Sequence, residues 1–169
     1  LYSSAASDVY KRQIKKHMDG VIFAGEVDIR VIEEFRKQSI PVVLVNNYLD
    51  MDGLVCISAD HYGGAVQATE YLCKLGHCKI GLLSGRFSPQ VSEARIEGFV
   101  KTLAKYDIPV DDRFIADIEP ALEDGEEIMT RMLREVDRPT AFFCTNDTIA
   151  AGAMKAVTRA GLRVPEHIA

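Results

Sequence analysis

Short runs rich in strand-forming apolar residues alternate with amphipathic stretches along most of this 169-residue chain. The runs occupy residues 20–25, 40–47, 54–60, 79–85, 113–118 and 139–145. A strand with one face in water alternates apolar and polar residues. Most of these runs are instead apolar throughout, which is typical of strands buried on both faces. The pattern therefore predicts an α/β doubly wound fold in which helices cover parallel sheets.

Helices are predicted between the runs, at residues 29–37, 61–75, 88–106, 124–135 and 147–160. Ser88 and Pro89 are a capping hydroxyl and a first-turn proline at the start of the third helix. Gly76 is placed to end the second helix, and Gly161 to end the last one. We expect Asp147 to cap the last helix, so that Asn146 points elsewhere.

The charge balance argues against a nucleic-acid-binding surface. The chain carries 20 Lys and Arg residues against 25 Asp and Glu residues, a net charge of −5. An acidic surface does not attract phosphate backbones. No run approaches the ~18 apolar residues of a membrane-spanning helix.

The two ends of the sequence differ from its middle. Residues 1–13, LYSSAASDVYKRQ, show no helix or strand period and no apolar face, and we interpret them as a non-native tail. At the other end Pro165 biases Val164 toward extended backbone, which predicts the start of a strand within 164–169. We therefore expect a fragment that is incomplete at both ends and exposes uncovered apolar surface.

The four cysteines, Cys56, Cys73, Cys78 and Cys144, are predicted to be buried free thiols of a reducing compartment, two of them in strand-like runs. Cys73 and Cys78 stand near His77, but no second ligand pair follows, so no metal site is predicted. The phosphate-binding loops and nucleophile motifs of common enzyme folds are missing. We expect neither catalysis nor a cofactor.

Arg95 is the most informative single side chain. Ligands of open parallel sheets bind at the carboxyl ends of strands, where Asn46 and Asn146 are candidate contacts. Arg95 borders the apolar stripe of the 88–106 helix, and its neighbours three and four residues away are not acidic. Either it pairs elsewhere or snorkels to solvent, or its guanidinium donates two hydrogen bonds to a ligand.

Several stretches taken together resemble the effector-binding core of the LacI/GalR family of bacterial transcription regulators. The stretches are MDGVIFAG (18–25), IPVVLVNN (40–47), residues 57–85, EARIEGF (93–99), residues 138–157 and residues 161–169. The resemblance implies two Rossmann-like subdomains with parallel sheets, of the periplasmic-binding-protein-like type I, holding an effector in the cleft. Residues 14–60 would be a partial N-terminal subdomain and residues 61–169 a partial C-terminal one.

The resemblance also implies site residues. Arg95 would clamp the effector, and Ile118 stands where members often place a stacking aromatic, a role that Phe87 could take over. The remaining expected ligand contacts are Asn46, Asn146, Gln90 and Val91. Ile149 and Met154 are candidates for a dimer interface, with the core as the alternative location for both.

The function implied is the effector-sensing domain of a cytoplasmic, homodimeric repressor. The effector would be a small polar metabolite such as a sugar or sugar derivative, and operator DNA would be bound by a helix-turn-helix that this sequence lacks. One alternative is an extracytoplasmic substrate-binding protein of a sugar transporter, which shares the fold; another is a Rossmann-type enzyme. The free cysteines and the Gly-His unit before residue 79 favour the regulator.

Overall fold

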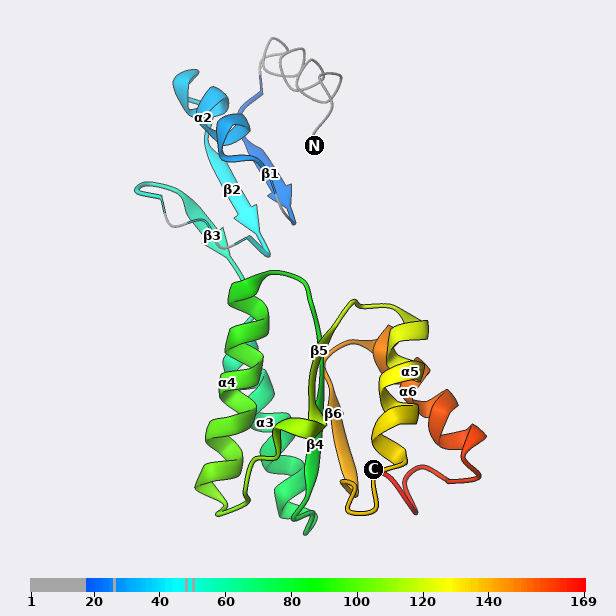
Figure 1. The fold of residues 1–169 in the computed structure, drawn as a ribbon. Helices are drawn as coiled ribbons and strands as arrows, with labels where there is room; N and C mark the ends of the chain where they lie inside the picture. The colour runs from blue at the N-terminus through cyan, green and yellow to red at the C-terminus, as the bar shows by residue number, and fades with distance from the viewer. Residues whose placement is uncertain (1–17, 26, 48, 50) are drawn as a thin grey trace. The chain divides into compact units, whose positions relative to one another are not determined.

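The computed structural model describes residues 18–25, 27–47, 49 and 51–169, and it confirms an α/β fold with parallel sheets (Figure 1). The chain divides into two compact units, Leu1–Ala59 (unit 1) and Asp60–Ala169 (unit 2). The segment 1–13, interpreted above as a tail, lies outside the described residues. Within the described ranges, no helix is long and apolar enough to cross a membrane.

Unit 1 contains a parallel sheet of three strands in the order β1-β2-β3, with helix α2 between the first two in sequence. The elements are β1 (Val21–Ala24), α2 (Ile29–Lys37), β2 (Val42–Val45) and β3 (Val55–Ile57). Ile32 and Phe35 of α2 form a buried cluster with Val42 and Leu44 of β2. Asp28 caps the helix by accepting a hydrogen bond from the Arg30 backbone N–H. The amphipathic pattern of 29–37 thus covers one face of this sheet.

The opposite face of the unit 1 sheet is apolar and open. Ile22, Val43 and Val55 are register partners across the three strands. Ile22 is 71% exposed, and Val55 and Ile57 are each 56% exposed. Contiguous apolar surface of this kind is uncommon on soluble monomers and favours association with other apolar groups.

Unit 2 is a three-layer arrangement around a parallel sheet in the order β5-β4-β6. Figure 1 shows α3 and α4 on one side of the sheet and α5 and α6 on the other. The elements are α3 (His61–Lys74), β4 (Ile80–Gly85), α4 (Pro89–Lys105), β5 (Ile115–Ile118), α5 (Leu122–Leu133), β6 (Ala141–Cys144) and α6 (Asp147–Arg159), with a 3-10 turn at Asp112–Phe114. All six residues of β4 are buried, as its unbroken apolar run predicts.

Several predicted boundaries are confirmed. The Ser88 side chain accepts a hydrogen bond from the Val91 backbone N–H, and Pro89 is the first residue of α4. Gly76 and Gly161 follow α3 and α6 with φ values of 90° and 73°, a left-handed conformation that glycine adopts without strain.

Other predicted boundaries are wrong. Helix α5 begins at Leu122 rather than at residue 124. Glu123 and Asp124 therefore lie in its first turn, where acidic side chains interact favourably with the positive end of the helix dipole. Residues 164–167 form a turn instead of an extended segment. The predicted start of a strand is confirmed at the last residue, because Ala169 donates to the Thr140 carbonyl and accepts from the Phe142 N–H at the edge of β6.

Helices α5 and α6 pack closely because each carries a glycine at the contact. A Cβ added to Gly152 would lie 2.1 Å from the Leu122 carbonyl oxygen, and one added to Gly125 would lie 2.5 Å from the Ile149 carbonyl oxygen. Backbone atoms cannot move aside as a flexible side chain does, so both positions exclude any larger residue.

We expect Gly152→Ala to lower the free energy of unfolding by about 1–3 kcal/mol, because the added methyl group forces α5 and α6 apart. Urea unfolding monitored by circular dichroism measures the change. Gly64→Ala is the matched control, since this α3 position has open space around its Cβ and should gain up to about 1 kcal/mol from better helix propensity. Equal effects of the two substitutions would contradict the packing argument.

The open face of unit 1 should bind a hydrophobic dye such as anilinonaphthalene sulfonate in the folded chain. Replacing Ile22 by Ser should reduce the dye fluorescence, because it removes the most exposed apolar side chain of β1 from that face. The control is Met154→Ser, an exposed apolar side chain of unit 2. An equal loss of fluorescence in both variants would argue against this face as the dye-binding surface.

Candidate functional site

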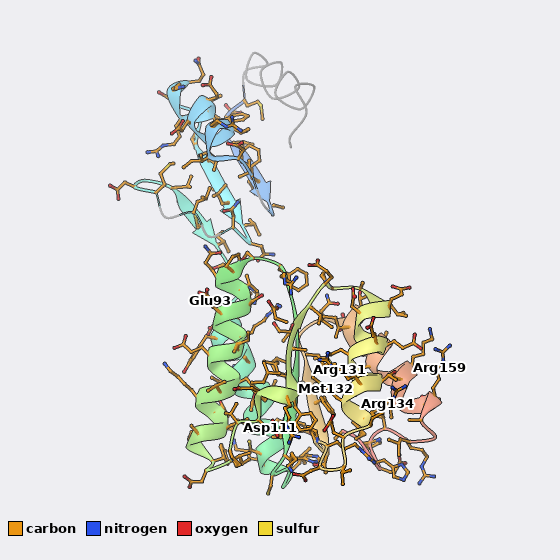
Figure 2. The ribbon with its side chains drawn as sticks, in the orientation of Figure 1. Glu93, Asp111, Arg131, Met132, Arg134 and Arg159 are labelled. Atoms are coloured by element: carbon orange, nitrogen blue, oxygen red, sulfur yellow. The ribbon has the colours of Figure 1, made fainter. Side chains whose placement is uncertain are left out.

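The carboxyl ends of the three strands of unit 2 bring polar residues together at one edge of the sheet. Gly85 of β4 is the register partner of Ile118 of β5, and Leu83 of β4 is the partner of Cys144 of β6. The Thr145 hydroxyl, one residue past β6, accepts a hydrogen bond of 2.9 Å from the Gly85 backbone N–H. Figure 2 labels Glu93 on the first turns of α4 at this carboxyl edge, and Asp111 at the opposite, amino-terminal edge.

Arg95 extends from α4 to this carboxyl edge. Its Nη1 donates to the Thr145 Oγ1 at 3.4 Å, and its Nη2 lies 3.5 Å from the His61 Nδ1. The guanidinium carbon lies 5.3 Å from the centroid of the Phe87 ring, in a cation–π arrangement. The structure therefore brings Arg95 and Phe87 together, and adds two contacts that sequence reasoning did not select, Thr145 and His61.

A signal for Thr145 was present in the sequence, because it is the last residue of the predicted strand-like run 139–145. The sequence did not mark His61 as a site residue. His61 is the first residue of α3, and only the packing of α3 against α4 brings it to Arg95. Burial and the positive charge of Arg95 lower the pKa of His61, while the charge of Asp60 opposes the shift. The imidazole is therefore held in its neutral form more strongly than a free histidine.

Asn146 takes the role that we assigned to Asp147. Its side-chain oxygen accepts hydrogen bonds from the backbone N–H groups of Thr148 and Ile149, at 2.8 and 3.2 Å, so Asn146 is the N-cap of α6. Asn caps helices as well as Asp does, and its extended backbone conformation suits the cap position. The prediction that Asn146 points away from the helix is wrong, although its amide nitrogen still lies at the carboxyl edge.

The other expected ligand contacts differ in accessibility. Gln90 is exposed, whereas Val91 is only 6% exposed and lies inside the unit. Ile118 packs against the core that β4 forms with α5 and α6. Asn46 follows β2 in unit 1, where it is exposed, adopts a φ of 53° and donates its backbone N–H to the Ile57 carbonyl.

The two candidates for a dimer interface differ in solvent exposure. Ile149 is fully buried in the core between β4, α5 and α6, which favours the alternative location in the core over a dimer interface. Met154, on the same helix, is 55% exposed and is available for contact with another molecule.

The cysteines are free thiols, as predicted, but not all of them are buried. Cys56 of β3 is exposed and its thiol donates to the Leu49 carbonyl, contrary to expectation, because β3 lies at the edge of its sheet. Burial raises the pKa of Cys144 to about 11, which keeps this thiol protonated beside the candidate site.

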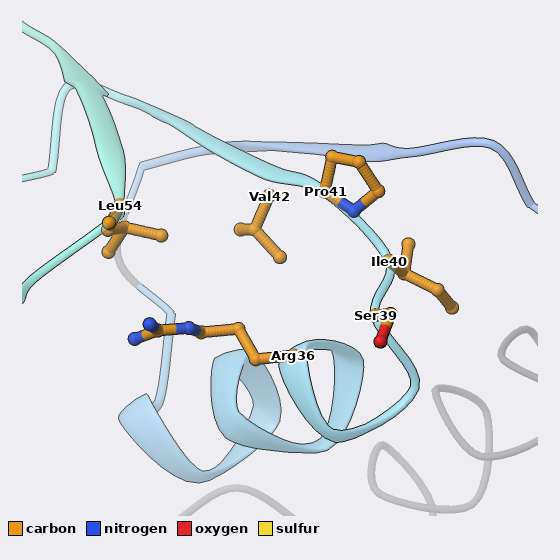
Figure 3. Close-up of a pocket in the computed structure, with 7 residues that line it drawn as sticks. Arg36, Ser39, Ile40, Pro41, Val42 and Leu54 are labelled. Atoms are coloured by element: carbon orange, nitrogen blue, oxygen red, sulfur yellow. The ribbon is translucent and has the colours of Figure 1, made fainter.

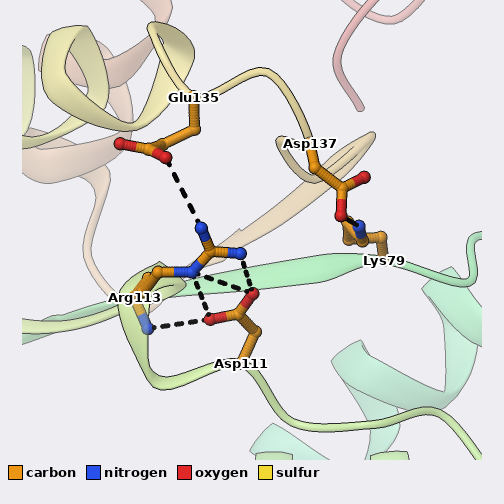
Figure 4. Close-up of polar contacts among 5 residues, drawn as sticks. All are labelled: Lys79, Asp111, Arg113, Glu135 and Asp137. Atoms are coloured by element: carbon orange, nitrogen blue, oxygen red, sulfur yellow. Dashed lines mark hydrogen bonds and ion pairs between the residues drawn. The ribbon is translucent and has the colours of Figure 1, made fainter.

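Two cavities lie away from the predicted site residues. One, of about 220 Å³, lies in unit 1, where Arg36 reaches from α2 toward Leu54 (Figure 3). The other, of about 550 Å³, lies at the amino-terminal edge of unit 2. Around it Arg113 pairs with Asp111 and Glu135, and Lys79 pairs with Asp137 (Figure 4). These are mostly exposed ion pairs, which contribute little to stability.

Comparison with known proteins gives a consistent result. The family model described as periplasmic binding proteins and sugar binding domain of the LacI family matches residues 4–169. The probable HTH-type transcriptional repressor ExuR of Bacillus subtilis (strain 168) is 34% identical over 152 residues, which cover 89% of this chain and 46% of the repressor. The HTH-type transcriptional repressor PurR of Actinobacillus pleuropneumoniae serotype 5b (strain L20) is 37% identical over 158 residues, which cover 92% of this chain and 46% of that protein.

Solved structures agree with these matches. A regulatory protein of the LacI family from Chloroflexus aggregans has a TM-score of 0.86 and 27% identity, over 99% of this chain and 62% of that one. A LacI family transcriptional regulator from Enterococcus faecium, with bound ribose, has a TM-score of 0.80 and 27% identity, over 95% of this chain and 61% of that one. The chain spans about half the length of the curated relatives it matches.

The lowered pKa of His61 predicts a loss of stability in mild acid. Below the ordinary histidine pKa of 6.5 the unfolded chain binds a proton that the folded chain resists, so the free energy of unfolding should fall from about pH 7 to pH 5. His61→Gln should flatten this slope in urea unfolding at each pH. His77→Gln, at the amino-terminal edge, is the control; an unchanged slope in the His61 variant would refute the assignment.

Proposed function

This chain belongs to the family of periplasmic binding proteins and sugar-binding domains of the LacI family, and from that membership we propose that it is the effector-sensing part of a DNA-binding transcriptional regulator. The two curated relatives compared above are named as repressors, which favours a regulator over a transporter's binding protein. Operator DNA would be contacted by a part of the protein outside these 169 residues. The regulator would act in the cytoplasm and transform no substrate.

The observation that carries this proposal is the position of Arg95. Its guanidinium lies at the carboxyl edge of unit 2, against the face of the half-exposed Phe87 ring and beside the Thr145 hydroxyl. A guanidinium donates several hydrogen bonds in a fixed plane, and an aromatic ring offers an apolar surface to the C–H groups of a sugar. Such an edge suits a small polyhydroxylated ligand.

The remaining ligand contacts are proposed from the same edge and from unit 1. Gln90 at the start of α4 and the amide of Asn146 are polar groups near the strand ends of unit 2, and Ile118 would supply apolar surface. Val91 is buried and would support the start of α4 from inside the unit. Asn46 would contribute from the end of β2. The ribose in the Enterococcus faecium regulator supports a sugar or sugar derivative as the effector class.

Sensing would operate through differential affinity. An effector that binds one arrangement of the two units better than another shifts the equilibrium between them, and a homodimer that includes the Met154 face would pass that shift to the DNA-binding part.

Arg95→Ala should weaken effector binding by about 1.5–3 kcal/mol, the usual contribution of a hydrogen bond to a charged group. The measurement is calorimetric titration of the regulator with a metabolite selected by thermal-shift screening. Arg113→Ala is the matched control, because Arg113 also stacks on a phenylalanine but lies at the amino-terminal edge. Unchanged affinity in a folded Arg95 variant would remove the main support for the proposed function.

A further inference from the structure

Two polar atoms near the carboxyl edge of unit 2 are buried without a hydrogen-bond partner in the described part of the chain. They are the Ser84 Oγ and the Asp117 Oδ1. Ser84 is fully buried, and the other carboxylate oxygen of Asp117, Oδ2, lies 3.5 Å from the Arg86 Nε. An unpaired buried hydroxyl or carboxylate oxygen destabilises a fold, so a pair of them at one place requires an explanation.

The two atoms come from register partners. Ser84 of β4 and Asp117 of β5 pair directly in the parallel ladder, so their side chains leave the sheet on the same face. That face is the one covered by α3 and α4, because Leu82, two residues before Ser84, packs against Phe99 and Leu103 of α4. The pair therefore faces the helix that carries Arg95.

The register extends this pair into a polar row. Leu83 pairs with Cys144, so the next step along the strands places Thr145 beside Ser84. The row then runs Asp117, Ser84, Thr145 across three strands, and Arg95 donates to the hydroxyl at its far end. One end of the row offers an acceptor, the carboxylate oxygen of Asp117, and the other end carries a donor, the guanidinium.

The chemistry of the unpaired atoms limits what can satisfy them. A carboxylate oxygen only accepts hydrogen bonds, whereas a serine hydroxyl both donates and accepts. A ligand hydroxyl can donate to Asp117 and accept from Ser84 in one position. An ionised phosphate or carboxylate oxygen has no proton to donate and is repelled by the Asp117 charge.

We propose that Ser84 and Asp117 are specificity-determining residues that receive a hydroxyl group of a neutral, polyhydroxylated effector. The inference rests on the proposed function and names the ligand group that this edge selects. Without the effector the two buried atoms remain unpaired, which lowers the stability of the chain.

The first test compares melting temperatures of the whole chain without ligand. Ser84→Ala removes an unpaired buried hydroxyl and should raise the melting temperature by about 2–4 °C. Ser92→Ala is the matched control, because Ser92 is also buried but its hydroxyl donates to the Gly85 carbonyl, and its removal should lower the melting temperature. A fall for Ser84→Ala like that for Ser92→Ala would overturn the proposal, because the hydroxyl would then be satisfied inside the protein, for example by an ordered water.

The second test uses D-ribose as the probe in thermal-shift titrations of the same proteins and of Asp117→Asn. Apparent affinity at least about tenfold weaker in the Ser84 and Asp117 variants than in the Ser92 variant supports the proposal. Equal affinities in all of them overturn it. A third outcome is a higher melting temperature for Ser84→Ala together with no response to ribose in any protein. This outcome supports the unpaired state of Ser84 and counts against sugar sensing. The proposed function can therefore fail while the observation on Ser84 holds.

Discussion

Strand β4 determines how unit 2 is built. It is bonded to β5 on one edge and to β6 on the other, and each of its six residues is buried. A parallel strand enclosed in this way needs helices on both faces of the sheet, because its side chains point alternately to each side. Because the strands are parallel, each helix must return the chain to the amino-terminal edge of the sheet. The carboxyl ends of all three strands, with their polar residues, therefore lie together at the opposite edge. Arg95, Thr145 and Phe87 meet there for this reason.

Much of this architecture was readable from the sequence, because burial on both faces leaves continuous apolar runs and helix ends leave local signals. The Ser88 cap, the glycine after α3 and the inward direction of Arg95 all followed from residue type and spacing. One error arose where two residues compete for one local role. Asn146 and Asp147 are both good caps, and only the backbone conformation decides between them.

The candidate site was less predictable than the fold, because its contacts depend on tertiary packing. His61 lies 34 residues before Arg95, and Thr145 lies 50 residues after it. No local pattern connects such residues. Likewise, Ser84 belongs to an apolar run and reads as a core residue, yet the register places its hydroxyl beside an acidic side chain of the neighbouring strand.

The Thr145 hydroxyl oxygen accepts two hydrogen bonds, one from the Gly85 backbone N–H at 2.9 Å and one from the Arg95 guanidinium at 3.4 Å. If a ligand draws the guanidinium away, the shorter bond between the strand ends of β6 and β4 is still in place. Recognition at this edge can thus proceed with no change in strand spacing.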